Sequence, residues 1–303
     1  MRSAVAAIGT FDGVHKGHLT VVEKLKEIAA EKDIDPIVIT FDSHPLTIIA
    51  PERTPSSITS TEKKCELLRG AGVMALVMHF DREMRETTAR DWMRRLHDEY
   101  GVVGLVVGYD NTFGSDGVTL SIADYKRIGA ELGIEVVEAP FVAGISSSAI
   151  RKAIIAGDID RATSMLGRYY SLSGTVVTGN RLGRTIGFPT ANLLPQPELI
   201  IPANGVYAAI AVLPDGSRRQ AIVNIGTRPT VRRGDQRTVE AHIIDFDGDL
   251  YGHPISLIFR KRLRDEMKFK SIEALRQQIE KDRDAAKVFL SDATKSGKQQ
   301  LYL

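Results

Sequence analysis

Short β-rich runs alternate with segments of helical periodicity along the first half of the chain, and few folds are compatible with this pattern. Apolar runs at 4–8 and 37–41 flank a segment, 19–32, whose apolar residues recur at helical spacing. A strand–helix–strand unit normally pairs its strands in parallel through a right-handed crossover. The alternation therefore predicts a doubly wound α/β sheet.

The alternation continues beyond this first unit. The further elements expected are strands at 73–78, 102–107 and 134–137 and helices at 61–68, 89–100 and 121–132. Thr61 is expected to cap the first of these helices, and Lys64 to lie inside it. Such Rossmann-like sheets bind ligands at the carboxyl ends of their strands, near the point where the strand order reverses. The loops that begin at Gly9, Asp42 and Gly108 all leave such ends.

The pattern changes near residue 168. Two short helices are expected before it, at 147–156 and 160–167. The β-rich runs after it are separated by Gly, Pro, Asn and Asp and lie at 171–177, 206–212, 220–225, 238–244 and 255–260. This spacing predicts a C-terminal β-barrel, followed by one amphipathic terminal helix at 271–290. We therefore expect two domains, 1–168 and 169–303.

Composition excludes several classes of protein. The single cysteine, Cys65, rules out an intramolecular disulfide and a multi-cysteine metal site. The 40 basic and 38 acidic residues give a net charge of +2, without the basic excess of a dedicated DNA-binding protein. No apolar run approaches the roughly 18 residues of a membrane span, and the first apolar run is too short for a secretory signal. We expect a cytoplasmic enzyme.

The loop after the first expected strand, GTFDGVHKGH, is a candidate phosphate site. Gly9, Gly13 and Gly17 allow a ligand to approach the backbone, and His15 and His18 lie at the entrance of the next helix. A helix N-terminus has unpaired N–H groups and a positive partial charge, which favour anions. The loop matches neither a P-loop nor the dinucleotide fingerprint. A structural helix cap with two exposed histidines and a metal-binding histidine pair are the alternatives.

A second candidate anion site is the segment GISSSAIRKAI. Ser146 or Ser147 is a suitable N-cap for a helix, and Arg151 follows about one turn later. Hydroxyl, backbone N–H and guanidinium groups would converge there. The alternative is an ordinary serine-capped helix with a surface arginine.

Together, G-T-F-D-G-V-H-x-G-H and I-S-S-S-x-I-R resemble the paired motifs of nucleotidylyltransferases. With F-D-S-H-P at 41–45, they resemble the N-terminal module of bacterial bifunctional riboflavin kinase/FAD synthetases. The resemblance implies that the phosphate of FMN attacks the α-phosphorus of ATP here and that His15 and His18 are catalytic. The implied ATP contacts are Gly9, Phe11, Asp12, Gly13, His15, Gly17, His18, Ser147 and Arg151, and the implied flavin contacts are Asp42, His44 and Asp110.

The second expected domain begins with a glycine-rich segment, TGNRLGRTIGFPTANL. Its glycines and the arginines between them suit a mobile loop over phosphates: Gly179, Arg181, Gly183, Arg184 and Gly187. Thr190 and Asn192, which follow Pro189, would point to one side of an extended strand. Both offer oxygen atoms suited to Mg²⁺ with nucleotide phosphate. A glycine-rich hairpin with ordinary turn residues is the alternative.

Two later segments contain polar residues that would complete a site. In NIGTRPT, Asn224, Gly226 and Thr230 would line the same crevice, unless the segment is only a strand exit with a proline turn. In TVEAHIID, the alternation turns Glu240 away from the core, where its carboxylate would take a proton from an alcohol. A surface carboxylate on a half-exposed strand is the alternative.

G-F-P-T-A-N, N-I-G-x-x-P-T and V-E-x-H-x-x-D-F-x-G-D-L-Y-G, in this order, resemble the riboflavin kinase module of the same family. The resemblance implies that Thr190 and Asn192 bind Mg²⁺ and ATP and that Glu240 is the general base for the 5′-hydroxyl of riboflavin. Further implied contacts are Gly179, Gly183, Arg184, Gly187 and Pro189 for ATP and Asn224, Glu240, Arg264 and Phe269 for the flavin.

We therefore expect a bifunctional enzyme that phosphorylates riboflavin to FMN in the barrel and adenylylates FMN to FAD in the α/β domain. ATP and Mg²⁺ would serve both steps, and no nucleic-acid or membrane partner is expected. The alternatives are a monofunctional riboflavin kinase with an impaired adenylyltransferase domain and a nucleotide- or RNA-binding barrel protein. The RNA alternative would use Arg228, Arg232, Arg233 and Arg237, which we interpret instead as a solvated hairpin loop.

Some positions depart from the family pattern. Ser148 stands where the family usually has threonine. The loop at 111–117 is short and not basic, whereas the family commonly has an aromatic residue and a longer basic loop. Asp265 and Met267 replace a frequent proline and lysine near the implied flavin contacts.

Overall fold

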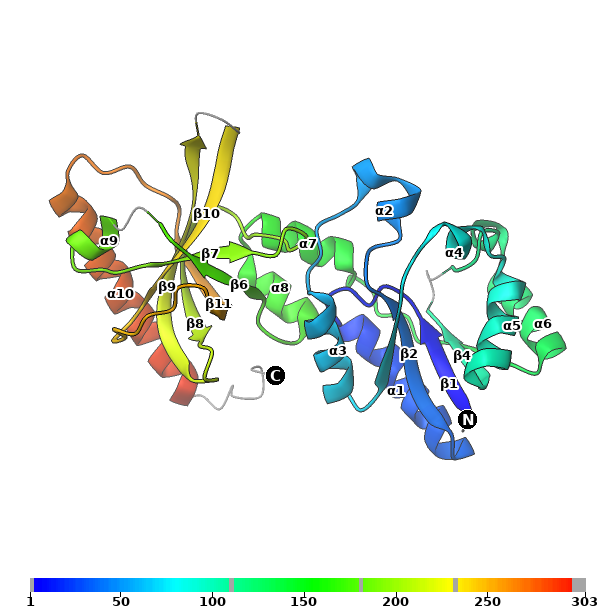
Figure 1. Ribbon diagram of the computed structural model, residues 1–303. Helices are drawn as coiled ribbons and strands as arrows, with labels where there is room; N and C mark the ends of the chain where they lie inside the picture. The colour runs from blue at the N-terminus through cyan, green and yellow to red at the C-terminus, as the bar shows by residue number, and fades with distance from the viewer. Residues whose placement is uncertain (1–2, 109–111, 180–181, 231–233, 296–303) are drawn as a thin grey trace. The chain divides into compact units, whose positions relative to one another are not determined.

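The computed structural model describes residues 3–108, 112–179, 182–230 and 234–295. The chain divides into two compact units, Met1–Ser147 and Ser148–Leu303. The first contains an α/β sheet and the second a closed barrel with a terminal helix (Figure 1), which confirms the expected fold class. The boundary expected after residue 168 stays a prediction.

Five parallel strands build the first unit in the order β3-β2-β1-β4-β5. The strands are β1 (Ala4–Ile8), β2 (Asp35–Phe41), β3 (Met74–Met78), β4 (Val102–Val107) and β5 (Glu135–Glu138). β1 pairs with β2 on one side and with β4 on the other, so the strand order reverses at β1. Doubly wound sheets bind ligands at this position, and the candidate phosphate loop leaves it directly after β1.

Helices cover both faces of this sheet (Figure 1). One face packs on α1 (Lys16–Lys32) and α3 (Thr61–Gly70), and the other packs on α5 (Ala89–Tyr100) and α6 (Ile122–Leu132). Side chains of β1 alternate between the two cores, and the strand is buried along its whole length. A strand buried on both faces reads as a continuous apolar run, which explains the pattern at 4–8.

The limits of periodicity are visible at short helices and at caps. The sequence analysis missed α2 (Leu46–Ile49) and α4 (Arg82–Glu86), because a helix of four or five residues contains hardly more than one period. It also expected Thr61 to cap α3. The cap is Ser60, whose hydroxyl accepts a hydrogen bond from the backbone N–H of Lys63.

Two further helices, α7 (Ser147–Ile155) and α8 (Ile159–Leu166), belong to the second unit, except that Ser147, the first residue of α7, is the last residue of the first unit. The barrel has the strand order β10-β7-β6-β11-β8-β9. Its strands are β6 (Ser171–Val177), β7 (Ala191–Pro195), β8 (Gly205–Val212), β9 (Arg218–Thr230), β10 (Gly234–Ile243) and β11 (Pro254–Arg264). The short α9 (Leu182–Thr185) precedes β7, and α10 (Ile272–Lys295) packs Ala286 and Leu290 against Ala208 and Ile222 of the barrel.

The basic cluster expected in a hairpin loop is only partly described. β9 and β10 extend through Arg228 and Arg237, so these two residues belong to strands. Arg237 donates hydrogen bonds to the carbonyl oxygens of Ile201 and Pro202, and burial lowers its pKa. Arg237 is exposed, as expected, but it belongs to β10, so its expected position in a loop is wrong. Arg232, Arg233 and the side chain of Arg228 lie outside the described residues.

Among the helices of the described ranges, none is long and apolar enough to cross a membrane.

Tyr125 ties α6 to the backbone that precedes it. Its hydroxyl accepts from the N–H of Phe113 (3.0 Å) and donates to the Phe113 carbonyl (2.7 Å), and the side chain is buried. Tyr125→Phe removes both bonds and should lower the free energy of unfolding of the first unit by about 1–3 kcal/mol. Trp92, the single tryptophan of the chain, is buried in the same core, so its fluorescence during urea unfolding reports this unit. Tyr100→Phe, at the end of α5, is the control, and an unchanged midpoint for Tyr125→Phe would contradict the assignment.

Candidate active sites

The loop after β1 is capped by one of its own histidines. His15 is the N-cap of α1, and its Nδ1 accepts a hydrogen bond from the backbone N–H of His18 (3.2 Å). Because a backbone N–H only donates, Nδ1 carries no proton and Nε2 carries it. The two imidazole rings stack with their centroids 3.6 Å apart. The helix cap weighed as an alternative is real, but His15 is buried and His18 is half-buried, so neither is an exposed histidine.

The same loop has a strained backbone. Phe11, Gly13 and Val14 have positive φ angles of 47°, 84° and 36°. This region is unfavourable for residues other than glycine, above all for a β-branched residue. Burial of Phe11 and Val14 in the core below the loop compensates the strain. The loop is therefore held in one conformation, as a phosphate-binding backbone requires.

A segment far away in the sequence also anchors the loop. The carboxylate of Asp12 accepts hydrogen bonds from the backbone N–H groups of Ile58 (2.9 Å) and Thr59 (3.1 Å). The N–H of Gly13 donates to the hydroxyl of Thr59 (3.1 Å). Sequence reasoning missed Ile58 and Thr59, because nothing in the local pattern joins them to residues 46 positions earlier.

The structure brings the serine motif to this loop. Ser147, the first residue of α7, donates a hydrogen bond from its hydroxyl to the carbonyl oxygen of Asp12 (2.9 Å). Gly17 leaves room for the His15 ring, because a Cβ on Gly17 would lie 3.2 Å from it. Arg151 lies one turn later in α7, within the second unit, and its contact with ATP stays a prediction.

The turn after β2 pairs with the end of β3. Oδ2 of Asp42 lies 2.7 Å from Nδ1 of His79, which follows β3 directly. The hydrogen bond that His79 donates to Asp42 raises the pKa of His79, and the charge of Asp42 adds to this. Burial acts to raise the pKa of Asp42. The hydrogen bond and the charge of His79, together with weaker hydrogen bonds from Ser43 and the backbone of Phe80, outweigh burial, so the pKa of Asp42 is lowered. His79 escaped the sequence analysis, although its position after a strand end was a usable signal.

Two further implied flavin contacts belong to this unit, and the structure describes His44 but not Asp110. Nδ1 of His44 accepts from the backbone N–H of Leu46 (3.1 Å) and so fixes the turn into α2. Asp110 lies outside the described residues.

In the second unit, one row of residues crosses five strands of the barrel. Asn192 of β7 lies opposite Glu240 of β10, and Glu240 lies opposite Asn224 of β9. The row continues through Val206 of β8 to Arg264 of β11. Because facing residues of paired strands share one side of a sheet, all five line the same cavity of about 570 Å³.

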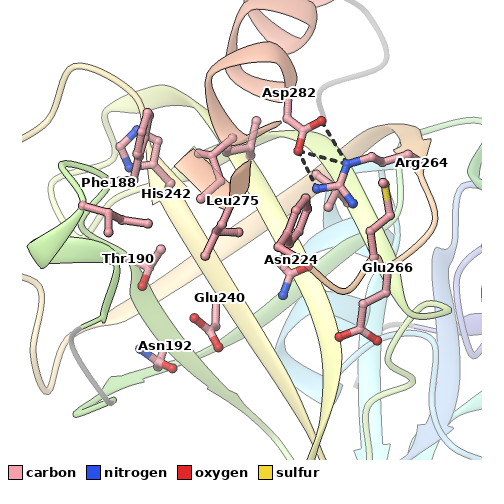
Figure 2. Close-up of a pocket in the computed structure, with 17 residues that line it drawn as sticks. Phe188, Thr190, Asn192, Asn224, Glu240, His242, Arg264, Glu266, Leu275 and Asp282 are labelled. Atoms are coloured by element: carbon pink, nitrogen blue, oxygen red, sulfur yellow. Dashed lines mark hydrogen bonds and ion pairs between the residues drawn. The ribbon is translucent and has the colours of Figure 1, made fainter. Parts of the chain in front are cut away.

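This cavity lies between the outer face of the barrel and α10. Figure 2 shows Thr190, Asn192 and Glu240 grouped at one end. Leu275 and other apolar side chains of α10 form the wall opposite the strands. Glu240 faces the cavity because its neighbours in the strand, Val239 and Ala241, are buried in the core, as the alternation predicted.

A buried ion pair closes the other end of the cavity (Figure 2). Nε of Arg264 lies 3.0 Å from Oδ1 of Asp282, and Nη2 lies 2.7 Å from Oδ2. Gln278 donates a further hydrogen bond to Oδ1 (2.9 Å). This bidentate pair joins α10 to β11. Arg264 and the cavity-lining Phe269 were expected from the resemblance, whereas Asp282 was not.

The glycine-rich segment shapes the polar end. A Cβ on Gly179 would lie 2.1 Å from the amide nitrogen of Asn192, so glycine leaves room for this side chain. The carbonyl of Gly183 accepts from the N–H of Phe188 (2.8 Å), and residues 182–185 form α9 where an open loop was expected. Gly187 has a φ of 84°, which favours glycine. Arg181 and the side chains of Arg184 and Thr230 lie outside the described residues.

A second cavity adjoins the first at Thr190. It has a volume of about 370 Å³ and is lined by Pro189, Thr190 and residues 246–251, among others. Thr190 lines both cavities. Nδ1 of His242 lies 2.9 Å from the carbonyl oxygen of Pro189 and therefore donates to it, and burial lowers the pKa of His242. This bond fixes the backbone directly before Thr190.

Two protein-family models match the chain. One is described as FAD synthetase and matches residues 1–151, and the other is described as riboflavin kinase and matches residues 166–290. Each model thus falls on one of the two candidate sites.

Similar proteins cover both units. The chain is 37% identical over 294 residues to a bifunctional riboflavin kinase/FMN adenylyltransferase of Escherichia coli (strain K12), which covers 94% of this chain and 92% of that protein. A protein of the same name in Bacillus subtilis (strain 168) is 35% identical over 303 residues, covering 96% and 94%. A crystal structure described as a macrolide-efflux protein from Streptococcus pneumoniae has a TM-score of 0.86 at 30% identity and covers 94% of each chain.

The pairing of Asp42 with His79 can be tested in solution. Asp42→Asn removes the negative charge that favours protonated His79, so the pKa of His79 should fall toward the ordinary histidine value of about 6.5. NMR titration of the imidazole measures it. Asp91→Asn, which removes an exposed carboxylate of α5, is the matched control. A His79 pKa that does not respond to Asp42→Asn would show that the pair is absent in solution.

Proposed function

Because this chain belongs to the family of bifunctional riboflavin kinases/FMN adenylyltransferases, it phosphorylates riboflavin to FMN and adenylylates FMN to FAD, and we propose that each reaction occurs at one of the two sites described above. The barrel cavity would be the kinase site, and the loop after β1 would be the adenylyltransferase site. The residue roles that follow are part of this proposal, as is a cytoplasmic location.

The position of Glu240 carries the kinase assignment. Phosphorylation forms a bond between the 5′-oxygen of riboflavin and the γ-phosphorus of ATP, breaks the bond to ADP and releases the hydroxyl proton. Glu240 offers a carboxylate to accept that proton. It shares one end of the cavity with Thr190, which also lines the smaller cavity. The transfer would therefore occur where the two cavities meet.

The two cavities suit different substrates. The larger cavity has an apolar wall that includes Phe269, Leu275 and Ile279, which suits the flat ring system of a flavin. The smaller cavity begins at Pro189 and Thr190 and would hold the nucleoside of ATP. Its phosphates would then extend past Thr190 toward Glu240.

The polar end of the larger cavity has the donors that Mg²⁺ prefers. The hydroxyl of Thr190 and the amide oxygen of Asn192 are hard oxygen donors, and Mg²⁺ in nucleotide sites usually takes one or two protein ligands besides phosphate and water. Because Gly179 has no Cβ, the Asn192 amide can occupy this position. Bound Mg²⁺ would neutralise charge on the ATP phosphates.

The adenylyltransferase site would work without a protein nucleophile. An oxygen of the FMN phosphate attacks the α-phosphorus of ATP, and pyrophosphate leaves. The N-terminus of α1 supplies backbone N–H groups, and His15 presents Nε2–H because its Nδ1 is occupied by the cap. With His18 stacked beside it, this donor set would bind the polyphosphate and stabilise the charge that grows during transfer.

Glu240→Gln tests the kinase site. The amide cannot accept the proton of the 5′-hydroxyl, so FMN formation from riboflavin and ATP should fall by about 10²–10⁴-fold. FAD formation from supplied FMN should be unchanged, and both are measured by chromatography of the flavin products. Glu198→Gln, an exposed carboxylate of the same unit, is the control. Equal loss of both activities in a folded protein would refute the two-site proposal.

His18→Ala tests the adenylyltransferase site. It keeps the backbone N–H of residue 18, which donates to the capping Nδ1 of His15, but removes the ring beside His15. FAD formation from FMN should fall by about 10²–10³-fold, as for the loss of one charge-stabilising donor. FMN formation should be retained. His97→Ala in α5 is the control, and full FAD formation in His18→Ala would overturn this assignment.

A further inference from the structure

We propose that Lys64 is a positioning residue of the adenylyltransferase site, whose buried ammonium group holds the phosphate loop and the end of β2, directly before Asp42, at a fixed separation. This inference rests on the proposed function of that loop. Lys64 belongs to α3, and its ammonium group donates to backbone carbonyl oxygens. It would therefore act on the substrates through the two backbone segments that it joins.

The contacts of Lys64 define the link. Nζ donates to the carbonyl oxygen of Phe41 (2.7 Å), the last residue of β2, and to the carbonyl oxygen of Thr10 (3.2 Å), within the phosphate loop. The hydroxyl of Thr40 donates to the same Thr10 carbonyl (3.0 Å). Lys64 itself is 7% exposed. One cation thus ties the ends of two adjacent strands below the place where ATP and FMN would meet.

Lys64 completes a bracket formed by residues 58–64. Ile58 and Thr59 hold the carboxylate of Asp12, Thr59 also holds Gly13, and Lys64 holds Thr10. All these bonds fall on the strained part of the loop or directly before it. Since Phe41 precedes Asp42, the bracket also reaches the turn implied to contact the flavin.

A lysine would be an unfavourable choice for a purely structural role at this buried position. Burying an ammonium group costs free energy even when it is hydrogen-bonded, and an apolar side chain of similar length would fill the same space. Burial lowers the pKa of Lys64, although the facing charges of Asp12 and Asp42 and the neighbouring Cys65 act to raise it. The ammonium form is therefore less favourable in the folded chain than in the unfolded chain.

The reaction gives the ammonium two effects. In-line attack requires the FMN phosphate and the α-phosphorus of ATP to be held near contact, and small displacements reduce the rate strongly. A positive charge below the loop also favours the transition state, in which negative charge grows on the leaving pyrophosphate. Both effects act on the chemical step more than on ATP binding.

Lys64→Met in the full chain tests the proposal, with Lys63→Met as the matched control. Lys63 precedes it in α3 but is more exposed and pairs with Glu66. For Lys64→Met, kcat for FAD formation should fall on the order of 10²-fold, with KM for ATP little changed. FMN formation should be retained. Removing the two hydrogen bonds of Nζ should lower the urea midpoint of Trp92 fluorescence, so FAD formation is compared under conditions in which this signal shows the variant folded. Unchanged FAD formation in the folded variant would overturn the proposal.

A pH profile provides a second readout that a structural role would not affect. FAD formation by the natural chain should decline at alkaline pH as Lys64 loses its proton, at a pH below the usual lysine pKa. Lys64→Met, which has no such proton, should lack this decline, and Lys64→Arg, which stays charged, should keep its rate there. Identical alkaline declines in the natural chain and in Lys64→Met would refute the role of the ammonium.

The two proposals fail in distinguishable ways. If His18→Ala abolishes FAD formation and Lys64→Met does not, only the inference about Lys64 is wrong. If neither variant affects FAD formation, the assignment of the loop itself is wrong.

Discussion

Backbone pairing between strands places the functional groups in both units. In the barrel, the register sets Asn192, Glu240 and Asn224 side by side although the sequence separates them widely. A slip of one residue in β10 would turn Glu240 into the core and Ala241 into the cavity. In the α/β sheet, parallel pairing brings the ends of β1, β2 and β3 to one edge. The chemistry of both sites therefore depends on strand register before it depends on any side chain.

In the function proposed above, the two sites would handle phosphate charge in different ways. The loop after β1 would use a helix N-terminus and the Nε2–H of His15, which are groups that already carry partial positive charge. The barrel offers hydroxyl, amide and carboxylate oxygens instead, which suit a metal ion between protein and phosphate. This difference matches the reactions: an alcohol must lose a proton, which Glu240 would accept in the proposed mechanism, whereas the phosphate of FMN is already an anionic nucleophile and needs mainly alignment.

Sequence reasoning succeeded wherever one segment contained the whole signal. The continuous apolar run of β1, the helical period of α1 and the alternation around Glu240 each report a local burial pattern. It failed where a group is defined by a distant partner. Lys64 was read as an interior position of a helix, His79 was not singled out and Asp282 was one polar residue of α10 among several. Each acquires its role only when pairing or packing brings its partner to it.

Several positions that contradict local rules lie at the proposed adenylyltransferase site. Phe11 and Val14 have backbone conformations that their side chains disfavour, and Lys64 is a buried cation that donates to two carbonyl oxygens. None of these would be chosen for stability alone, and each is compensated by contacts from residues 58–64 or by the core below. The contacts that hold this loop keep its N–H groups directed at one place before a ligand arrives. Rigidity of this kind lowers the reorganisation needed in the transition state, which is a physical reason for a stable sheet to support an unfavourable loop.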